Sequence, residues 1–232
     1  MRVRWDVDAV ANAILWRDLD AIPLRLVDGP GEWVADLGGG NGNFVSPLRR
    51  RGARLATVDI DRRALRQAGP LIRPILGSLT RLPLRDASLH AAAGRAVLHH
   101  VPEELDAAVR ESRRIVRPGG LVLFQEPTSG NWLANAARKR FPTERHDPHE
   151  RPLPGERYVE TIRRHFDVVE TRHEFLLSYL LPHLVARLPP DRRNLARALT
   201  RAVFGLDRRL LAALPGLRPR AAYVSVLARR PP

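Results

Sequence analysis

Four glycines fall within residues 38–42, directly after a short apolar run that ends in Asp36. Glycine allows positive backbone φ angles and lets a ligand approach the main chain closely, so this cluster predicts a loop shaped around a cofactor. The amides at the start of the following helix bind polar or anionic groups. Gly38, Gly40 and Gly42 alternate, and Asp36 can reach an ammonium group. The pattern therefore suits an amino-acid moiety better than a pyrophosphate.

A second acidic residue, Asp59, ends the next apolar run about twenty residues further along the chain. At the end of a strand a carboxylate can accept hydrogen bonds from both ribose hydroxyls, and such charge-assisted bonds contribute roughly 1.5–3 kcal/mol each. The spacing therefore predicts a ligand that contains ribose. NAD and S-adenosylmethionine both satisfy it, and these residues alone do not choose between them.

Histidines that could act as a general base or position a substrate occur in two segments. His99 and His100 form the first, and His146 lies with Asp147 and His149 in a proline-containing loop. The structural alternative for the first pair is packing against the following helix or capping it. For the loop residues, the alternative is that they hold the loop together.

A metal site is not expected. His146 and His149 are three residues apart with Asp147 between them, but their loop has no regular face to align them, and the chain has no cysteine. Glu126 ends a predicted strand, at the edge where α/β sites form. We consider two roles for it, substrate contact and loop anchoring.

Strands and helices alternate over the first ~125 residues, which is typical of a parallel sheet covered on both faces. The sequence thus predicts an α/β protein, with Asp61 as the N-cap of one helix and Gly52 at the end of another. The predicted strands cover residues 32–37, 54–60, 71–76, 88–93, 121–126, 167–175 and 220–228. The predicted helices cover residues 7–19, 43–51, 62–68 and 105–116, and a largely helical stretch covers 176–214.

We expect a single domain across residues 1–232, because this length suits one core. Residues 1–30 would form a leading helix and linker, and 31–126 the cofactor-binding core. Residues 127–157 and 175–215 would form a cap. The first of these cap segments is rich in Pro, His, Arg and Asp, and a long irregular insertion is more often a functional loop than filler.

Within the late helical stretch, apolar residues follow one helix face and arginines another. The apolar stripe comprises Leu195, Leu199, Ala202, Val203, Leu206 and Leu210. Arg193, Arg197 and Arg201 recur every four residues on the second face. We expect this arginine face either to be solvated over a packed core or to dock on an anionic membrane.

Arginine dominates the charge of the chain, since the formal net charge is +14 and Lys139 is the single lysine. A basic surface favours nucleic acid, anionic lipid or an acidic small molecule as partner. The absence of cysteine excludes disulfides and thiol nucleophiles. Charged residues interrupt both the N-terminal segment and the longest apolar segment, which argues against a signal peptide and a membrane span. These features predict a cytoplasmic protein, with peripheral membrane contact as a further option.

Four motifs, taken in order, resemble the class I S-adenosylmethionine-dependent methyltransferases, in particular the subgroup related to quinone biosynthesis and small-molecule methylation. They are DLGGGNG (36–42), VDID (58–61), GSLTRLPLRDASLHAAAGRAVLHHV (77–101) and RESRRIVRPGGLVLFQEP (110–127). The resemblance implies a Rossmann-like sheet of seven strands, mostly parallel with an antiparallel last strand, and S-adenosylmethionine as cofactor. The cofactor contacts that it implies are Asp36, Gly38, Gly40, Asn41, Gly42, Asp59, Ile60, Ser78, Leu79 and Gly94.

Two positions depart from the family pattern. Ser78 stands where the family often has an acid that contacts the adenine amine, and His90 replaces an aspartate at the start of the fourth strand. Neither departure affects the predicted fold.

The resemblance implies methyl transfer by in-line displacement to a small or lipophilic acceptor held under the cap. One alternative is RNA methylation, suggested by the net charge and the arginine face. Nucleic acid is the less favoured partner because the sequence contains no recognisable RNA-binding module. The other alternative is a cofactor-binding domain that has lost catalysis. The sequence sets no oligomeric state.

Overall fold

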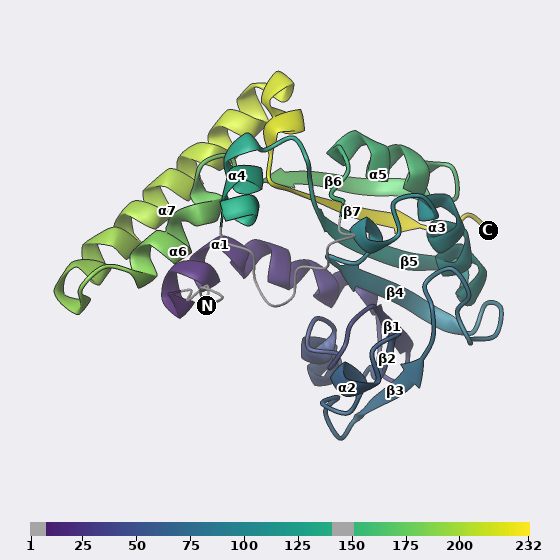
Figure 1. Ribbon diagram of the computed structural model, residues 1–232. Coiled ribbons are helices and arrows are strands. Elements are labelled where there is room, and N and C mark those ends of the chain that lie inside the picture. The colour runs from purple at the N-terminus through teal and green to yellow at the C-terminus, as the bar shows by residue number, and fades with distance from the viewer. Residues whose placement is uncertain (1–7, 141–150) are drawn as a thin grey trace.

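The structure is a computed structural model that describes residues 8–140 and 151–232. Its centre is a sheet of seven strands in the order β3-β2-β1-β4-β5-β7-β6 (Figure 1). The strands are β1 (Trp33–Leu37), β2 (Arg54–Asp59), β3 (Ile72–Leu76), β4 (Leu89–Arg95), β5 (Val116–Pro127), β6 (Asp167–Glu174) and β7 (Tyr223–Arg229). β7 runs antiparallel to both of its neighbours, and the other pairs are parallel. The predicted α/β fold with an antiparallel last strand is confirmed.

The strand order reverses at β1, which lies between β2 and β4. Val34 of β1 pairs with Leu55 of β2 on one side and with Ala91 of β4 on the other. In open α/β sheets a crevice forms at such a reversal, beyond the carboxyl ends of the strands. The glycine loop follows Leu37 at this edge, and Arg95 ends β4 there.

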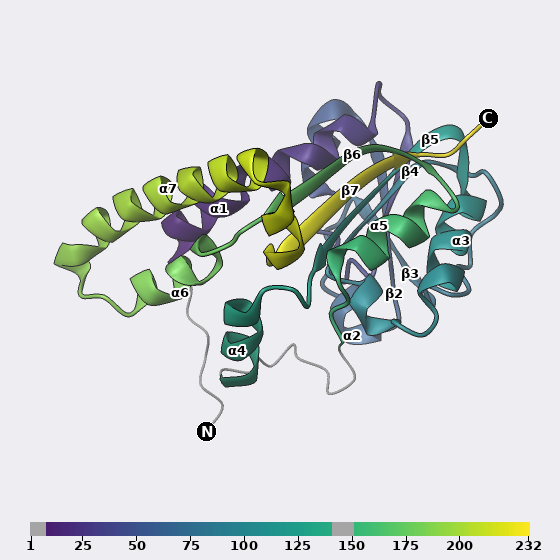
Figure 2. The ribbon, with the colours of Figure 1, turned by 90° about the horizontal axis from the view of Figure 1, so that it is seen from above.

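Apolar side chains fill a core on each face of the sheet. On one face, α3 (Leu105–Ile115) and α5 (Gly155–Arg163) cover a core that includes Phe124 of β5. On the other face, α1 (Ala9–Ala21) covers a core that includes Val34 of β1. Figure 2 shows the sheet between these two groups of helices. Burying one large apolar side chain contributes about 1.5–3 kcal/mol, so the two cores hold the layers together.

Two further helices, α6 (Leu181–Ala186) and α7 (Pro190–Ala213), pack with α1 in a lobe that extends from the sheet (Figure 1). Asp207, buried in α7, ties this lobe to the chain that leaves β6. Its carboxylate accepts the backbone amides of Leu176 and Ser178 at 2.8 and 2.9 Å. Hydrogen bonds to a charged group are stronger than neutral ones, so Asp207 fixes how α7 lies on the body.

The helix predicted over residues 43–51 is wrong in extent, since only a 3₁₀ turn, Ser46–Arg51, forms there. Gly42 has a φ of 76°, and Asn43 donates its amide to a neighbouring side chain, so the chain is still turning at these residues. Gly52 ends the turn with a φ of 78°, as predicted. The predicted cap by Asp61 is also confirmed.

The sequence does not predict two helices that follow β5. α4 (Trp132–Arg140) lies within residues 127–157, where an irregular segment is expected. α5 lies directly before β6, and its buried side includes Tyr158 and Ile162 among Glu and Arg residues. Its apolar side is narrow, and tertiary packing on the sheet rather than a strong periodic pattern stabilises it.

The two faces of α7 lie opposite to the expected orientation. Arg197 turns inward and pairs with Asp8, the N-cap of α1, at 2.7 Å. Arg193 donates to the carbonyl of Leu188 at 2.9 Å. By contrast, Leu195 of the apolar stripe is 69% exposed. The reason is that the buried positions of α7 lie on the arginine side; they are Thr200, Phe204, Asp207 and Leu211.

Candidate cofactor and acceptor site

The loop after β1 requires glycine at several positions. Gly38, Gly40 and Gly42 have φ angles of 64°, 52° and 76°, in the left-handed region that favours glycine. At Gly38 a Cβ atom would lie 2.0 Å from Cγ2 of Val97, so even alanine would collide there. Glycine is therefore required here by backbone conformation and by packing against Val97, and close approach of a cofactor to this loop stays a prediction.

Asp36 lies beneath this loop and is fully buried. Among the residues that the structure describes, neither of its carboxylate oxygens has a hydrogen-bond partner of normal geometry. Burial raises the pKa of Asp36 to about 7, while Arg95 and the nearby amides of Val45 and Phe44 oppose part of that rise. A buried carboxylate is costly unless a partner satisfies it. Asp36 therefore fits a cationic ligand group such as an ammonium.

Asp59 ends β2 and faces the glycine loop. One of its oxygens accepts the amide of Gly40 at 2.9 Å, and the other accepts the amide of Asp61 at 2.8 Å. Each carboxylate oxygen keeps further acceptor capacity, so Asp59 can also accept ribose hydroxyls. The next residue, Ile60, is 75% exposed, an unusual state for isoleucine and one that suits packing against a flat ring. Both assignments stay predictions that this geometry supports.

A cavity of about 510 Å³ opens beside the glycine loop. It is lined by Asp20, Asp36, Gly38, Gly39, Asn41, Asn43, Phe44, Pro47 and Arg95. Asp36, Gly38 and Asn41, three of the predicted cofactor residues, thus share one cavity.

A larger groove of about 980 Å³ lies elsewhere, and Trp33, Arg54 and Arg73 line part of it. These residues stand at the amino ends of β1, β2 and β3, whereas the glycine loop leaves the carboxyl end of β1. Sites in sheets of this kind form at the carboxyl edge. The smaller cavity is therefore the candidate site.

Arg95 is a cavity residue that the sequence reasoning missed. Its guanidinium pairs with Asp20 of α1 at 2.6 Å and donates to the Gln125 side chain at 2.8 Å. It also lies 4.2 Å from the centre of the Phe44 ring. Its position in the sequence could have pointed to it. Arg95 is a charged residue at the end of the alanine-rich strand β4, and charged groups at that edge often contact ligands.

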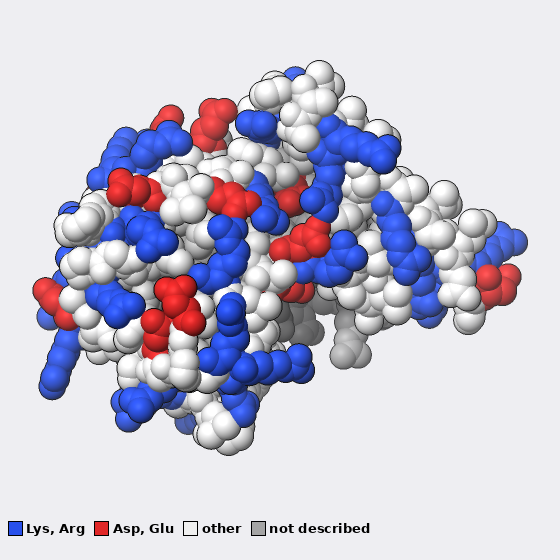
Figure 3. Space-filling view, turned by 180° about the vertical axis from the view of Figure 1, so that it is seen from behind, with Lys and Arg blue, Asp and Glu red and all other residues white. Residues whose placement is uncertain are grey.

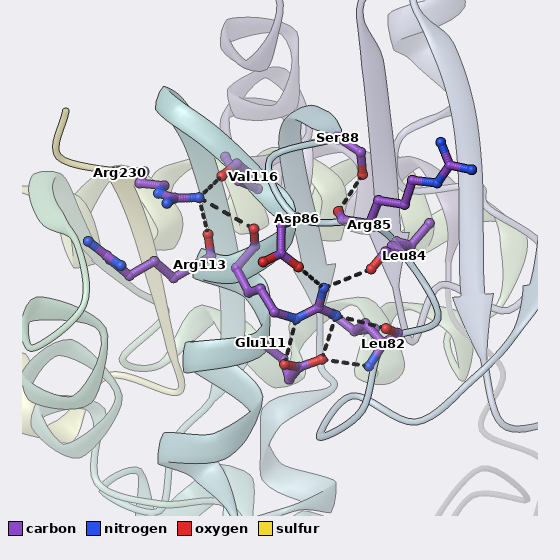
Figure 4. A network of polar contacts seen from close by, with 10 residues as sticks. Leu82, Leu84, Arg85, Asp86, Ser88, Glu111, Arg113, Val116 and Arg230 are labelled. Carbon is purple, nitrogen blue, oxygen red and sulfur yellow. Dashed lines mark hydrogen bonds and ion pairs between the residues drawn. The ribbon is translucent and has the colours of Figure 1, made fainter.

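Arg114 of α3 holds the loop that leads from β3 to β4, and Figure 4 labels its partners Leu82, Leu84, Asp86 and Glu111. Its guanidinium donates to the carbonyls of Leu82 and Leu84 at 2.9 and 2.8 Å and pairs with Asp86 at 2.6 Å. Glu111 pairs with Arg114 at 2.8 Å and accepts the amide of Leu82. The hydrogen bond from Arg114 lowers the pKa of Glu111. The network thus fixes the loop whose first residues are predicted to face adenine.

Ser78 and Leu79 begin that loop. The Ser78 hydroxyl lies 3.0 Å from that of Thr80, and Leu79 packs against the core under α3. A hydroxyl can donate one hydrogen bond and accept more, so an adenine contact by Ser78 stays a prediction. His90 lies at the amino end of β4, where its Nδ1 accepts the amide of Trp33 at 3.2 Å. His90, which departs from the family pattern, therefore lies at the opposite end of the strand from the glycine loop.

His99 is held inside the protein, with 5% of its surface exposed. Its Nδ1 lies 3.0 Å from Oε2 of Glu126. The other oxygen of Glu126 accepts the amides of Val97 and Leu98 at 2.9 and 3.0 Å. Both residues thus anchor the segment after β4, which supports the structural alternative for them.

The other predicted site residues have different surroundings. His100 is exposed, with its ring centre 4.3 Å from that of His99. Gly94 is buried, and a Cβ there would lie 2.8 Å from Cγ1 of Val97. His146, with Asp147 and His149, lies outside the described residues. Across residues 8–140 and 151–232, no group of three or more His, Asp or Glu side chains is arranged to hold a metal ion.

Aromatic side chains gather next to the cavity, between α1, α7 and the ends of β6 and β7. The cluster comprises Trp16, Phe175, Tyr179, Phe204 and Tyr223. Trp16 links it to the cavity, because the Arg95 guanidinium lies 5.1 Å from the Trp16 ring centre. Phe175, Phe204 and Tyr223 are buried, so the cluster is part of the core that joins α1 and α7 to the sheet beside the cavity.

Comparison with known proteins identifies relatives of this chain. Residues 35–124 match a family described as a methyltransferase domain. The chain is 32% identical over 167 residues to malonyl-[acyl-carrier protein] O-methyltransferase from Serratia marcescens, covering 70% of this chain and 65% of that protein. It is 36% identical over 128 residues to the ubiquinone/menaquinone biosynthesis C-methyltransferase UbiE of Caulobacter vibrioides, covering 48% and 50%. The chain thus spans less than two thirds of the length of either relative.

The fold is also similar to a solved structure, a chain of the complex between the Haloferax volcanii Trm112 methyltransferase activator and its methyltransferase. The TM-score is 0.66 at 17% identity, over 97% of this chain and 93% of that one. This likeness shows a shared fold. The shared fold, the matched family and the glycine loop above Asp36 are all consistent with the four sequence motifs. The matched family, the relatives and the four sequence motifs support a class I S-adenosylmethionine-dependent methyltransferase.

Proposed function

We propose that this protein transfers the methyl group of S-adenosylmethionine to a small or lipophilic acceptor. The observation that carries the proposal is the carboxylate of Asp36, which is fully buried under the glycine loop and has no hydrogen-bond partner among the described residues. A cationic hydrogen-bond donor would satisfy this carboxylate, and the methionine part of the cofactor carries an ammonium group.

The other residues around the loop fit the same cofactor. Arg95 supplies a cation among the residues that line the cavity, and it would face the methionine carboxylate, since guanidinium and carboxylate form paired hydrogen bonds. Asp59 would accept the ribose hydroxyls, and Ile60 would pack on adenine. These roles place one cofactor along the carboxyl ends of β1, β2 and β4.

S-adenosylmethionine, when bound, supplies a methyl group on an activated sulfonium centre. The task left to the protein is to orient the acceptor in line with that group and to exclude water. His99 is bound to Glu126 and serves structure in this proposal. His100 is exposed. For an acceptor that must lose a proton, we propose that His100 is the described histidine that takes it.

The acceptor assignment is supported by the names of the two relatives, a malonyl-[acyl-carrier protein] O-methyltransferase and a ubiquinone/menaquinone biosynthesis C-methyltransferase. We propose that residues 127–157 and 175–215 cover the acceptor within a single cytoplasmic domain. Among the described residues, no helix is both long and apolar enough to span a bilayer.

No specific observation favours either alternative function, RNA methylation or a cofactor-binding domain that has lost catalysis. The case for RNA rested partly on the arginine face of α7, and Arg193 and Arg197 of that face are bound within the protein. Against a degenerate domain, the chain keeps Asp36, Asp59 and the glycine loop, and the Gly40 amide donates to Asp59.

The test is an activity assay with S-adenosylmethionine labelled in the methyl group, incubated with polar and apolar fractions of a cell extract. We expect label in an organic-soluble product. Asp59→Ala should abolish that product, whereas Asp167→Ala, an exposed acid at the start of β6, should not. Label confined to RNA, or no label in any fraction, would count against the proposal.

A further inference from the structure

The outward side of α7 carries large apolar side chains in solvent. Leu195, Leu199 and Leu206 are 69%, 56% and 49% exposed. Their spacings of four and seven residues place them on one side of the helix. Soluble proteins expose single leucines routinely, but a row along one helix marks a contact surface. We call these three residues the leucine row.

Polar contacts on the opposite side keep the leucine row outward. Arg197 bonds Asp8 with two nitrogens, at 3.0 and 2.7 Å. Asp207 accepts three consecutive backbone amides from residue 176 onward. Rotating α7 to bury the leucines would break these bonds and leave the amides of residues 176–178 without their acceptor, which is costly. The exposure of the row is therefore built into the fold.

Arginines stand at both ends of the leucine row. Arg192 lies three residues before Leu195 and Arg209 three residues after Leu206, so both lie on the side of the row. Each is exposed and forms no ion pair with any described residue. Figure 3 shows the lobe of α6 and α7 at the right as a mostly white surface crossed by blue side chains.

We propose that α7 docks on the surface of an anionic phospholipid membrane, with the leucine row in the outer acyl region and Arg192 and Arg209 at the headgroup phosphates. A helix with a leucine side and flanking arginines matches surface-lying membrane helices, which do not span the bilayer. The two arginines are about 25 Å apart along the helix, so they would anchor its two ends. This inference is independent of the methyl acceptor.

A second copy of the chain suits the surface less well. Of the two acids in α7, Asp207 is buried, so Asp191 is the exposed one. Two leucine rows facing each other would bring four arginines into one contact with two acids. Anionic lipid neutralises these arginines, and the overall charge of +14 adds long-range attraction.

The experiment is co-sedimentation of the full chain with vesicles of phosphatidylcholine alone and of phosphatidylcholine with phosphatidylglycerol. We expect binding to the anionic vesicles, weakened about tenfold by Leu199→Glu/Leu206→Glu and also by Arg192→Gln/Arg209→Gln. The matched control is Leu71→Glu/Val169→Glu, which changes two exposed apolar positions elsewhere and should bind as the wild type does.

Thermal unfolding and S-adenosylmethionine titration should be the same for all these variants, which shows that they are folded. Equal binding to both vesicle types, or loss of binding in the control alone, would overturn the proposal. Absence of vesicle binding would also overturn the proposal. It would do so whether light scattering shows a monomer or a dimer that Leu199→Glu/Leu206→Glu dissociates.

Discussion

A Cβ atom on Gly39 would lie 2.1 Å from Cγ of Asp36. The glycine loop thus rests directly on the carboxylate that is proposed to bind the cofactor, and no side chain fits between them. The close contact between Gly39 and Asp36 therefore fixes both the shape of the glycine loop and the position of the Asp36 carboxylate.

Gly39→Ala should therefore weaken binding of S-adenosylmethionine. The added methyl group must push the loop from Asp36, and we expect the dissociation constant to rise at least about tenfold, equivalent to about 1.4 kcal/mol. Gly29→Ala is the matched control because no atom lies within 4 Å of a Cβ built there. Calorimetric titration measures both, and equal affinity for the two variants would contradict the account.

The raised pKa of Asp36 gives stability a definite pH dependence. The pKa is about 7 in the folded protein against an ordinary value of 3.8, so between these pH values the folded state retains a proton that the unfolded chain has lost. The free energy of unfolding should then fall as pH rises through this window and stay lower above it. Asp36→Asn should remove that loss, which is up to about 4 kcal/mol.

Denaturant unfolding on both sides of this window checks the sign. Glu174, whose pKa burial also raises to about 7, contributes in the same direction, so Glu174→Gln is the comparison. Each single variant should flatten the pH profile in part. Asp36→Asn alone should also lose cofactor affinity, and a profile that it leaves unchanged would contradict the assignment.

Arg114→Ala should release the loop between β3 and β4. Its guanidinium bonds two carbonyls and two carboxylates there, and the loss of a network of this kind costs several kcal/mol (about 2–4). We expect a lower melting temperature and weaker cofactor binding. Arg110→Ala, an exposed arginine on the same helix, should change neither. Thermal unfolding with and without S-adenosylmethionine separates the two effects.

His99→Gln tests whether His99 is structural. Because the imidazole is buried against Glu126, the variant should lose about 1–3 kcal/mol of stability. The pH profile of the turnover number should keep its shape once an acceptor is known. A profile that loses its limb near neutral pH in His99→Gln, but not in His100→Gln, would assign His99 as the base instead.

Local sequence patterns predicted the glycine loop, the strands and the cap by Asp61. Each of these depends on residues close together in the chain, such as Gly38 and Gly40 after an apolar run. Arg95 was missed because its surroundings come from α1, β5 and the glycine loop, which only the fold brings together.

The orientation of α7 could not be predicted for a related reason. The helix has a continuous leucine side, and burial of that side is the ordinary expectation. The fold instead buries the side that carries Phe204 and Asp207, because Asp8 and the amides after β6 supply partners for its polar groups. Those partners lie far away in the sequence.

The central claim is that the glycine loop, Asp36 and Asp59 bind S-adenosylmethionine. The most direct measurement is calorimetric titration of the purified protein with S-adenosylmethionine, beside Asp59→Ala and the control Asp167→Ala. The account predicts micromolar binding to the wild type and to Asp167→Ala, and none to Asp59→Ala. No binding to the wild type, or binding that Asp59→Ala leaves unchanged, would contradict it.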